Sequence, residues 1–363
     1  MTRIFLIFCG LVVTFAATAA DVSDSDFVAA YAKEHRFNGT ILIERRGEIQ
    51  RVTSFGLANF AFSVPNARDT EYKIASITKL FTSVLVLQLY EQGKLDLGAT
   101  ISSYLPNYTG EGARKVTIHH LLNHTSGIFN MDQVKSIQQA LEGGVPAYQS
   151  PYTSDQILEK FASGKLVSTP GTTFNYNNGD YVILGKIIEH IYGKSFEAVL
   201  AEKLIAPLHL THTGFLRQHM IVPHLADTYF YREDIKQLVP DLPVYPENWY
   251  AAGALYSTVD DLRLFSDALF GLKLIRQDTL ALMTKPGLDG YGYGIWAYDI
   301  EVDGKKFRVV KRPGQIMGAQ SQLYHFLDQD ITIVILSNTG TTDLDEFVQK
   351  IAERMVRQSP ASG

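Results

Sequence analysis

Cysteine is almost absent from this 363-residue chain, which contains one, Cys9. That residue lies in an apolar run near the amino terminus, so the rest of the chain has no thiol. Disulfide bonds and cysteine-ligated metal sites are therefore excluded beyond residue 20, because both need cysteine side chains. Stability must come from a hydrophobic core, and 46% of the residues are hydrophobic.

The chain also lacks an excess of positive charge. It has 33 lysine and arginine residues against 38 aspartate and glutamate residues, a formal net charge of −5 at pH 7. Nucleic acids and anionic membrane surfaces attract proteins with large basic patches. We therefore expect no nucleic-acid partner.

The apolar run near the amino terminus is too short to cross a membrane readily as a helix. Arg3 precedes an apolar run at residues 4–15, and small residues at 17–20 offer a cleavage site, the pattern of a secretory signal peptide. An acidic segment at residues 21–24 follows in place of a basic stop-transfer flank. Cys9 is a poor lipid-attachment site, because bulky Phe8 precedes it. We predict a signal peptide at residues 1–20, no stable membrane anchor after its removal, and a periplasmic or secreted mature chain.

Regular patterns indicate helices and strands along the remaining chain, without an internal repeat or low-complexity linker. Apolar strand patterns predict a hairpin early in the chain and an antiparallel meander near its end. One helix is apolar nearly all round, which predicts a central, buried position. Ser257 is expected to cap a further helix. The predicted strands are 38–44, 49–55, 292–302, 305–312, 320–327 and 331–336, and the helices include 26–35, one that begins near Ser76, 181–192 and 343–357.

One S-x-x-K sequence, Ser76 to Lys79, opens the apolar helical segment. Residues three apart lie on one face of a helix, so the Lys79 ammonium would reach back to the Ser76 hydroxyl. A serine becomes a useful nucleophile when a neighbouring base takes its proton and a helix N-terminus favours negative charge. Taken alone, the motif also fits a capping serine and a solvated lysine.

Histidine spacing raises the question of a metal site. His120 and His124 are four apart and would share a helix face, but no H-E-x-x-H sequence is present and no acidic residue lies between them. Structural histidines with hydrogen-bond partners inside the fold explain this pattern better than zinc ligands do. We predict no metal site and no cofactor.

One Y-x-N sequence, Tyr176 to Asn178, lies at the end of a turn-rich loop that follows Pro170. A turn stabilised by asparagine side chains, with an exposed tyrosine, would account for it. A tyrosine near a lysine ammonium can also accept and return a proton, which would make Tyr176 a general base and acid. The residues leave both interpretations open.

Together and in this order, these stretches resemble the serine β-lactamase and penicillin-binding-protein superfamily, most of all its class C and CubicO-type branch of hydrolases and esterases. The resemblance rests on residues 76–79, 120–127, 170–178, 253–261 and the strands that end at 336–338. It implies an α+β fold (β-lactamase/transpeptidase-like), in which an antiparallel sheet flanked by helices is built from both chain ends and a helical lobe is inserted. It further implies one domain over residues 21–363, with an α/β lobe at about 21–75 and 250–363 and a mainly helical lobe at about 76–249.

The resemblance also implies roles for residues in a cleft between the lobes. Ser76 would be the acylated nucleophile, Lys79 its proton partner, and Tyr176 the base for attack and the acid for the leaving group. Asn178 would hydrogen-bond the substrate. The backbone amides of Ser76 and Gln315 would form an oxyanion hole. Gly314 would let the substrate approach the strand that edges the cleft.

The third family motif, normally Lys or His followed by Thr and Gly, is replaced here by Arg312, Pro313 and Gly314. Pro313 fits an edge strand, but it removes the threonine hydroxyl that would contact a carboxylate. Arg312 could hold a substrate carboxylate through two hydrogen bonds. Alternatively, it pairs with a neighbouring acid or lies on the surface. The sequence leaves these roles open.

The resemblance implies a serine hydrolase that forms an acyl-enzyme with a small ester, amide or peptide and releases it to water. Esterase, D-amino-acid peptidase or carboxypeptidase, and β-lactamase activities all remain open, as does the oligomeric state. A separate acidic deacylation motif of the class A β-lactamase kind is not visible, so one base should serve both half-reactions. The alternative function is a slow penicillin-binding or cell-wall-peptide sensor that is acylated once and stays acylated.

Overall fold

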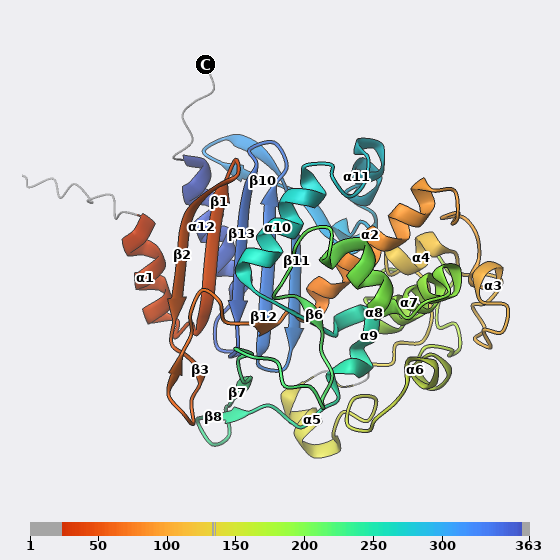
Figure 1. The fold of residues 1–363 in the computed structure, drawn as a ribbon, viewed down its shortest axis with the longest axis horizontal. Helices are drawn as coiled ribbons and strands as arrows, with labels where there is room; N and C mark the ends of the chain where they lie inside the picture. Colours follow the sequence, from red (N-terminus) through yellow and green to blue (C-terminus); the bar gives the residue numbers. More distant parts are fainter. Residues whose placement is uncertain (1–23, 133, 135, 358–363) are drawn as a thin grey trace, which may run out of the picture.

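A six-stranded antiparallel sheet forms the centre of the protein. The computed structural model describes residues 24–132, 134 and 136–357, so the predicted signal peptide at residues 1–20 lies outside the described residues. The strand order is β10-β11-β12-β13-β1-β2, which brings the two ends of the chain side by side within one sheet (Figure 1). The strands are β1 (Gly39–Arg45), β2 (Glu48–Phe55), β10 (Trp296–Val302), β11 (Lys305–Ile316), β12 (Ala319–Phe326) and β13 (Ile331–Ser337).

The pairing of β1 with β13 joins the amino-terminal hairpin to the carboxy-terminal meander. It runs in register from Gly39 opposite Ser337 to Arg45 opposite Ile331. Every residue of β13 is buried. A strand buried on both faces has a continuous apolar run in place of alternation, because helices cover both sides of the sheet. The antiparallel sheet with flanking helices expected from the sequence is confirmed.

The meander differs from the sequence prediction next to the cleft. β10 begins at Trp296 and not at Gly292, because residues 292–295 form a turn closed by a hydrogen bond from Gly292 N to Ile295 O. Gly294 in this turn has a φ of +79°, which a glycine adopts without steric cost. The last residue of β11 with a β10 partner is Lys311, although β11 continues to Ile316. The end of β11 is therefore a free edge on that side.

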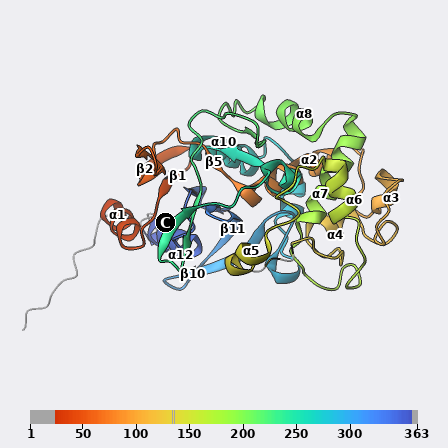
Figure 2. The same ribbon diagram turned by 90° about the horizontal axis from the view of Figure 1, so that it is seen from below.

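Helices cover both faces of the sheet. Figures 1 and 2 show α1 and α12 on one face, and α10 with the larger group of helices on the other. Most of the buried apolar residues accordingly form one cluster beneath α1 and α12 and a second, larger one around α2, α7 and α10, and a small third cluster contains Ala147, Tyr148 and Trp249. The helices are α1 (Asp24–Glu34), α2 (Thr78–Glu91), α3 (Ile101–Tyr104), α4 (Ile118–Leu122), α5 (Ile137–Gly143), α6 (Ser154–Phe161), α7 (Asn178–Tyr192), α8 (Phe196–Leu200), α9 (Tyr250–Gly253), α10 (Val259–Phe270), α11 (Gln277–Met283) and α12 (Leu344–Arg357).

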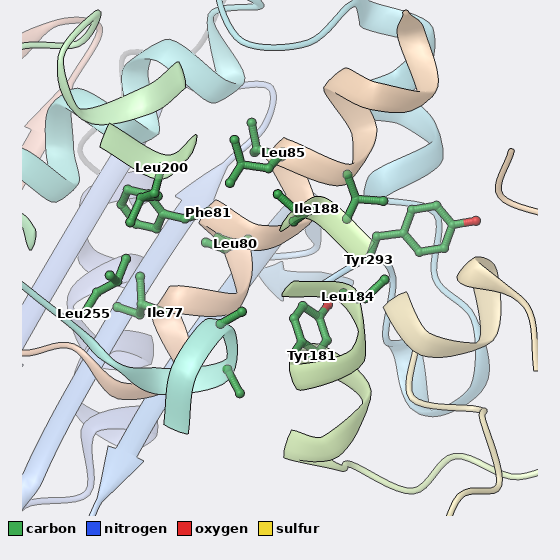
Figure 3. Packing of buried hydrophobic residues seen from close by; sticks show 14 of the residues in the cluster. Ile77, Leu80, Phe81, Leu85, Tyr181, Leu184, Ile188, Leu200, Leu255 and Tyr293 are labelled. Atoms are coloured by element: carbon green, nitrogen blue, oxygen red, sulfur yellow. The ribbon is translucent and has the colours of Figure 1, made fainter. Parts of the chain in front are cut away.

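α2 lies at the junction of the sheet and the helices, as its all-round apolar sequence predicts. Leu80, Phe81 and Leu85 on α2 are 0% exposed, and they lie among side chains from α7 and α8 (Figure 3). Phe81 stacks on Phe265 of α10 with ring centroids 3.9 Å apart. Full burial of such a side chain contributes about 1.5–3 kcal/mol relative to exposure. The start of α2 is therefore held on a rigid mount.

α10 begins one position later than the sequence predicts. Thr258, and not Ser257, is its N-cap, because the Thr258 hydroxyl accepts a hydrogen bond from Asp261 N. Ser257 ends strand β9 (Leu255–Ser257), and its hydroxyl lies 2.8 Å from that of Thr213. The serine is thus part of a strand and does not cap the helix.

Shorter elements surround the main sheet. The helical turns are η1 (Ala75–Ile77), η2 (Ala201–Ile205), η3 (Pro246–Trp249) and η4 (Leu288–Gly290), and the short strands are β3 (Leu57–Asn59), β4 (Val64–Pro65), β5 (Tyr72–Lys73), β6 (Gly214–Phe215), β7 (Tyr229–Arg232), β8 (Gln237–Pro240) and β9 (Leu255–Ser257). Among the residues described, no helix combines the length and apolar character needed to cross a membrane.

Candidate active site

Ser76 lies in the 3₁₀ turn η1, immediately before α2 and not within it. The α-helix begins two residues after Ser76, so the expectation of a helix that begins near Ser76 is confirmed, and Ser76 itself lies in the turn that leads into the helix. The preceding residue, Ala75, is fully buried and has a φ of 47°. This left-handed conformation is unfavourable for an alanine and is maintained by the surrounding structure. The bend presents the Ser76 hydroxyl to a cavity.

Lys79 is fully buried on the first turn of α2, with its ammonium directed at Ser76. Its Nζ donates hydrogen bonds to Ser76 Oγ at 3.1 Å, to Asn178 Oδ1 at 2.6 Å and to the Ala252 carbonyl at 2.9 Å. An ammonium has three N–H donors, so all of them are matched to acceptors. Burial lowers the pKa of Lys79 from 10.5 to about 8, although the nearby Tyr176 oxygen opposes the shift.

Tyr176 is brought to the same hydroxyl from the loop before α7. Its phenolic oxygen lies 2.8 Å from Ser76 Oγ. Burial would raise the pKa of Tyr176, but the cations of Arg312 and Lys79 outweigh it and bring the pKa from 10.0 down to about 8. α7 begins at Asn178 because the Asn177 side chain caps it by accepting from Gly179 N, three residues before the predicted start.

Arg312 lies beneath the site with no exposed surface. Its guanidinium donates from Nη2 to the Tyr176 oxygen at 2.6 Å, from Nη1 to the Tyr291 hydroxyl at 2.8 Å and from Nε to the Ser76 carbonyl at 2.7 Å. The structure thus contradicts the alternative that Arg312 lies on the surface or pairs with an acid. Its alternation with Pro313 along β11 turns it inward, beneath Tyr176.

Gly314 brings the free edge of β11 against the nucleophile. A Cβ atom at this position would lie 2.9 Å from Ser76 N and 2.5 Å from the Ile74 carbonyl. Such distances are too short for any side chain, which explains the glycine. Gln315 follows it and is exposed at the same cavity as Ser76.

Asn178 and Asp132 form a second layer of polar contacts behind Lys79. Asn178 accepts from Lys79 and donates from Nδ2 to Asp132 Oδ2 at 2.7 Å. Asp132 also accepts from the Tyr148 hydroxyl. Burial raises the pKa of Asp132, and its hydrogen bond from Tyr148 and the charge of Lys79 oppose this. Sequence reasoning missed Asp132, Tyr148 and Tyr291, because they lie in segments without a recognisable motif.

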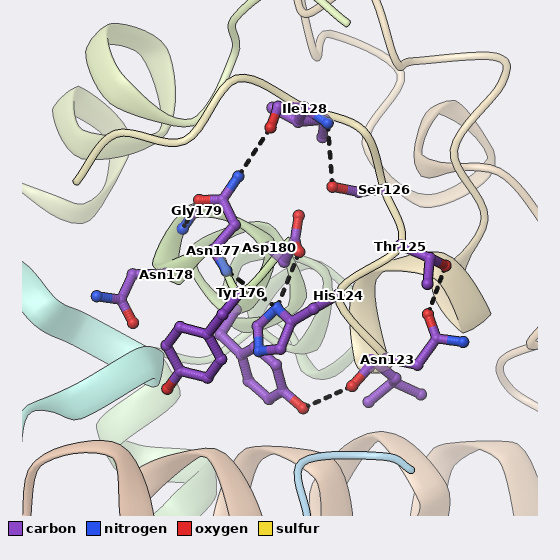
Figure 4. A network of polar contacts seen from close by, with 12 residues as sticks. Asn123, His124, Thr125, Ser126, Ile128, Tyr176, Asn177, Asn178, Gly179 and Asp180 are labelled. Carbon is purple, nitrogen blue, oxygen red and sulfur yellow. Dashed lines mark hydrogen bonds and ion pairs between the residues drawn. The ribbon is translucent and has the colours of Figure 1, made fainter. Parts of the chain in front are cut away.

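His124 and Asp180 form a buried pair next to Tyr176 (Figure 4). His124 Nδ1 lies 3.0 Å from Asp180 Oδ2, and neither side chain is exposed. The His124 ring packs 4.4 Å from that of Tyr176, measured between centroids. Burial lowers the pKa of His124 and raises that of Asp180, so the neutral form of each group is favoured.

The two motif histidines have separate structural partners. His120 Nδ1 accepts from Thr117 N and completes a capping box at the start of α4, whereas His124 lies beyond the end of that helix with a φ of 57°. They therefore do not share a helix face. Among the described residues, no group of three or more histidine, cysteine or acidic side chains is arranged to hold a metal ion.

Two cavities meet at Gln315. The first, of about 590 Å³, is lined by Ser76 and Tyr176 and continues to residues 340–345. The second, of about 580 Å³, adjoins Asn178 and has apolar walls, which are formed by Met131, Val145, Pro146, Ala147, Phe161, Trp249, Ile316 and Met317. A half-buried nucleophile and base beside two buried cations, at the mouth of such cavities, can carry out acyl transfer.

The fold and these residues define a serine hydrolase of the S-x-x-K type. Residues 25–356 match the model of the Beta-lactamase family, and the chain belongs to that family.

Relatives with known names share this family. A Staphylococcus aureus protein named teichoic acid D-alanine hydrolase is 27% identical over 273 residues, which cover 74% of this chain and 64% of that protein. The match thus spans less than two thirds of that relative's length.

Solved structures show the same fold. A penicillin-binding protein from Bacillus halodurans is 25% identical, with a TM-score of 0.75 over 90% of this chain and 98% of that one. A D-amino acid amidase from Ochrobactrum anthropi SV3 is 21% identical, with a TM-score of 0.73 over 92% of this chain and 98% of that one.

Proposed function

We propose that the protein hydrolyses a small ester or amide through an acyl-enzyme on Ser76. The observation that carries this proposal is the position of the Ser76 hydroxyl, 2.8 Å from the Tyr176 oxygen and 3.1 Å from Lys79 Nζ. Both distances are within reach of direct proton transfer. Within this scheme Tyr176 is the base. The Lys79 ammonium stabilises the negative charge on the oxygens of Tyr176 and Ser76.

The proton follows a closed path. Tyr176, as a phenolate, takes the proton of Ser76 as the serine oxygen bonds to the substrate carbonyl carbon. Tyr176 then gives that proton to the departing alcohol or amine, and the acyl-enzyme remains. A water molecule attacks the acyl carbon while Tyr176 accepts its proton, and the proton returns to Ser76 when the ester bond breaks. One base thus serves both half-reactions.

Arg312 is proposed to keep Tyr176 ionised and not to bind a substrate carboxylate. Its zero exposure and its hydrogen bond of 2.6 Å to the Tyr176 oxygen support this role. A guanidinium stays charged at every working pH, so its effect on the Tyr176 pKa persists throughout the cycle. A hydrogen bond to a charged oxygen is also stronger than one between neutral groups.

The oxyanion of the tetrahedral intermediate is proposed to lie between the backbone amides of Ser76 and Gln315. The close approach of Gly314 to Ser76 supports this position, because it brings the free edge of β11 to the nucleophile. Loss of one such donor typically costs roughly 2.7–4 kcal/mol of transition-state stabilisation. Both ends of the Asn178 amide already have hydrogen-bond partners, Lys79 and Asp132. We therefore expect any contact of Asn178 with the substrate to be made beside Lys79, without a change in the position of the amide.

The apolar cavity beside Asn178 supports an acyl group with an apolar part. The relative named teichoic acid D-alanine hydrolase and the structural neighbour named D-amino acid amidase support D-aminoacyl esters or amides as substrates to test first. We also propose that the mature chain, after loss of residues 1–20, acts in the periplasm or outside the cell. Amino-terminal sequencing of the protein from culture fractions tests this location.

Intact mass spectrometry over time tests the proposed function. The purified mature protein is treated with a fluorophosphonate, with D-alanine methyl ester and with a penicillin. We expect a fluorophosphonate adduct, a short-lived D-alanyl adduct and release of D-alanine, all abolished in Ser76→Ala. Because Ser76 does not cap α2, this variant should keep the wild-type melting temperature. A penicilloyl adduct that persists, without turnover of any ester, would favour the sensor, and labelling of Ser76→Ala would place the nucleophile elsewhere.

A further inference from the structure

The cavity at Ser76 continues around the edge of the sheet to the amino end of α12. Ser321 of β12 donates to the Ile74 carbonyl on the side of the nucleophile. Neighbouring residues of a strand point to opposite faces, so Gln320 and Gln322 point to the face that α12 covers. Both glutamines nevertheless line the same cavity as Ser76.

Gln322 presents an acceptor without a partner in this part of the cavity. The residue is 0% exposed, and its amide orientation is fixed because Nε2 donates to Asp345 Oδ1 at 2.6 Å. In the described part of the chain, the Oε1 atoms of Gln322 and Gln320 are both buried and have no hydrogen-bond partner. Buried acceptors of this kind are usually satisfied in proteins, so their place in a substrate cavity points to a ligand that donates hydrogen bonds.

The charge at this end of the cavity is negative. Asp343 and Asp345 both line it. Lys311 donates to Asp345 at 2.9 Å and balances one carboxylate. Asp343 accepts from Glu346 N at the start of α12 and has no cation within ion-pair distance among the described residues. This end of the cavity therefore has more hydrogen-bond acceptors than donors and a net negative charge, because one lysine faces two carboxylates and two amide oxygens without partners.

We propose that this end of the cavity binds an ammonium group of the substrate, a proposal that rests on the acyl-enzyme function above. An ammonium has three donors and no acceptor, which matches Asp343, Gln320 Oε1 and Gln322 Oε1. Gly314 of β11 contacts Ser76, and β12 lies one strand spacing beyond β11, so these oxygens lie on the order of 10 Å from Ser76. The substrate class is an ester or amide with a cationic group about six atoms from the scissile carbonyl.

Matched esters test the proposal and identify the side of the substrate that carries the charge. In the leaving-group arm, kcat/KM is measured for 6-aminohexyl acetate, hexyl acetate and 5-carboxypentyl acetate. In the acyl arm, methyl 6-aminohexanoate is compared with methyl hexanoate. We expect the amino ester to exceed its neutral match by roughly tenfold in one arm, the scale of a hydrogen bond to a charged group. A higher value for the carboxylate ester, or no preference in either arm, would overturn the proposal.

Three variants locate the preference. Asp343→Asn removes the charge but keeps a good N-cap for α12, and Gln322→Met removes the free acceptor with little change in volume. Each should reduce the ratio of amino to neutral ester several-fold. Glu346→Gln is the control, because it removes a charge from the same helical turn outside the cavity lining and should leave the ratio unchanged. A preference that survives both cavity substitutions contradicts the assignment.

A binding measurement separates failure of this proposal from failure of the proposed function. Calorimetric titration with 1,6-diaminohexane and with 1,6-hexanediol requires no turnover. If none of the esters is hydrolysed, binding of the diamine and not the diol, weakened by Asp343→Asn, still supports the ammonium site. Equal binding of the two compounds, or binding that Asp343→Asn leaves unchanged, overturns it.

Discussion

Arg312 donates a hydrogen bond of 2.6 Å to the phenolic oxygen of Tyr176, and no carboxylate takes part in that contact. A buried arginine normally lies beside an acid that balances its charge. Here the tyrosine oxygen can provide that balance by losing its proton. The pairing explains why the pKa of Tyr176 falls to about 8 despite burial.

Tyr176→Phe should remove the proton relay and preserve the packing of the ring. We expect kcat/KM for ester hydrolysis to fall by roughly 10²–10⁴, the usual effect of losing a general base. In the wild type, kcat/KM should rise with pH through about 8, because the base form appears as Tyr176 loses its proton. Activity near normal in the phenylalanine variant, with the same pH profile, would show that another group is the base.

Arg312→Gln should move the pH profile to the alkaline side. Removal of the cation raises the pKa of Tyr176, so less phenolate is present at neutral pH. The loss of kcat/KM should be large at pH 7 and smaller at pH 10, and it should be similar for esters with and without a carboxylate. Arg308→Gln on the same strand is the control, since Arg308 pairs with Asp299 at a partly exposed position. A loss confined to carboxylate substrates would make Arg312 a substrate ligand instead.

Gly314→Ala should impair turnover more than binding. Its Cβ would lie 2.9 Å from Ser76 N and 2.3 Å from Ser321 Oγ, so β11 must move away from the nucleophile. We expect kcat to fall at least tenfold with a smaller change in KM, because the proposed oxyanion site widens. Gly304→Ala is not a suitable control for a glycine-to-alanine change, because Gly304 has a φ of +74° and an alanine there would be strained. Thr341→Ala, at the same cavity but away from Ser76, should leave kcat within about twofold. Equal kcat values for the two variants would contradict this role of the β11 edge.

Asp180→Asn should be tolerated, whereas Asp180→Ala should not. Burial raises the pKa of Asp180, which favours a neutral carboxyl group beside His124, and an asparagine amide can replace such a group as a donor. Asp180→Ala removes this hydrogen bond and leaves His124 Nδ1 with the Asn177 backbone amide as its remaining partner, so it should lower the free energy of unfolding by about 0.5–1.5 kcal/mol. Chemical denaturation of both variants measures the difference. A strong destabilisation by asparagine would mean that Asp180 is charged.

The family resemblance of the motifs predicted the fold, and local signals predicted most strands and the candidate site residues. Strand patterns and the apolar surround of α2 are set by neighbouring residues, and Ser76, Lys79 and Tyr176 lie in recognisable motifs. The position of Arg312 could not be predicted, because its inward orientation depends on the face of β11 from which its side chain projects, and the pairing of β11 with β12 fixes that face. Asp132 was missed for a related reason, since its contact with Asn178 joins residues 46 positions apart. The cap of α10 was misplaced by one residue, because Ser257 belongs to a strand whose pairing is not local.

The ionisation of Tyr176 is the central claim of this account, and ultraviolet difference titration measures it directly. Absorbance of the tyrosinate form is followed from pH 6 to 10 in the wild type and in Tyr176→Phe. We expect the difference between the two proteins to show one tyrosinate with a midpoint near pH 8, moved to higher pH by Arg312→Gln. If the wild-type protein forms no tyrosinate until the pH approaches the ordinary tyrosine pKa of about 10, the account is contradicted.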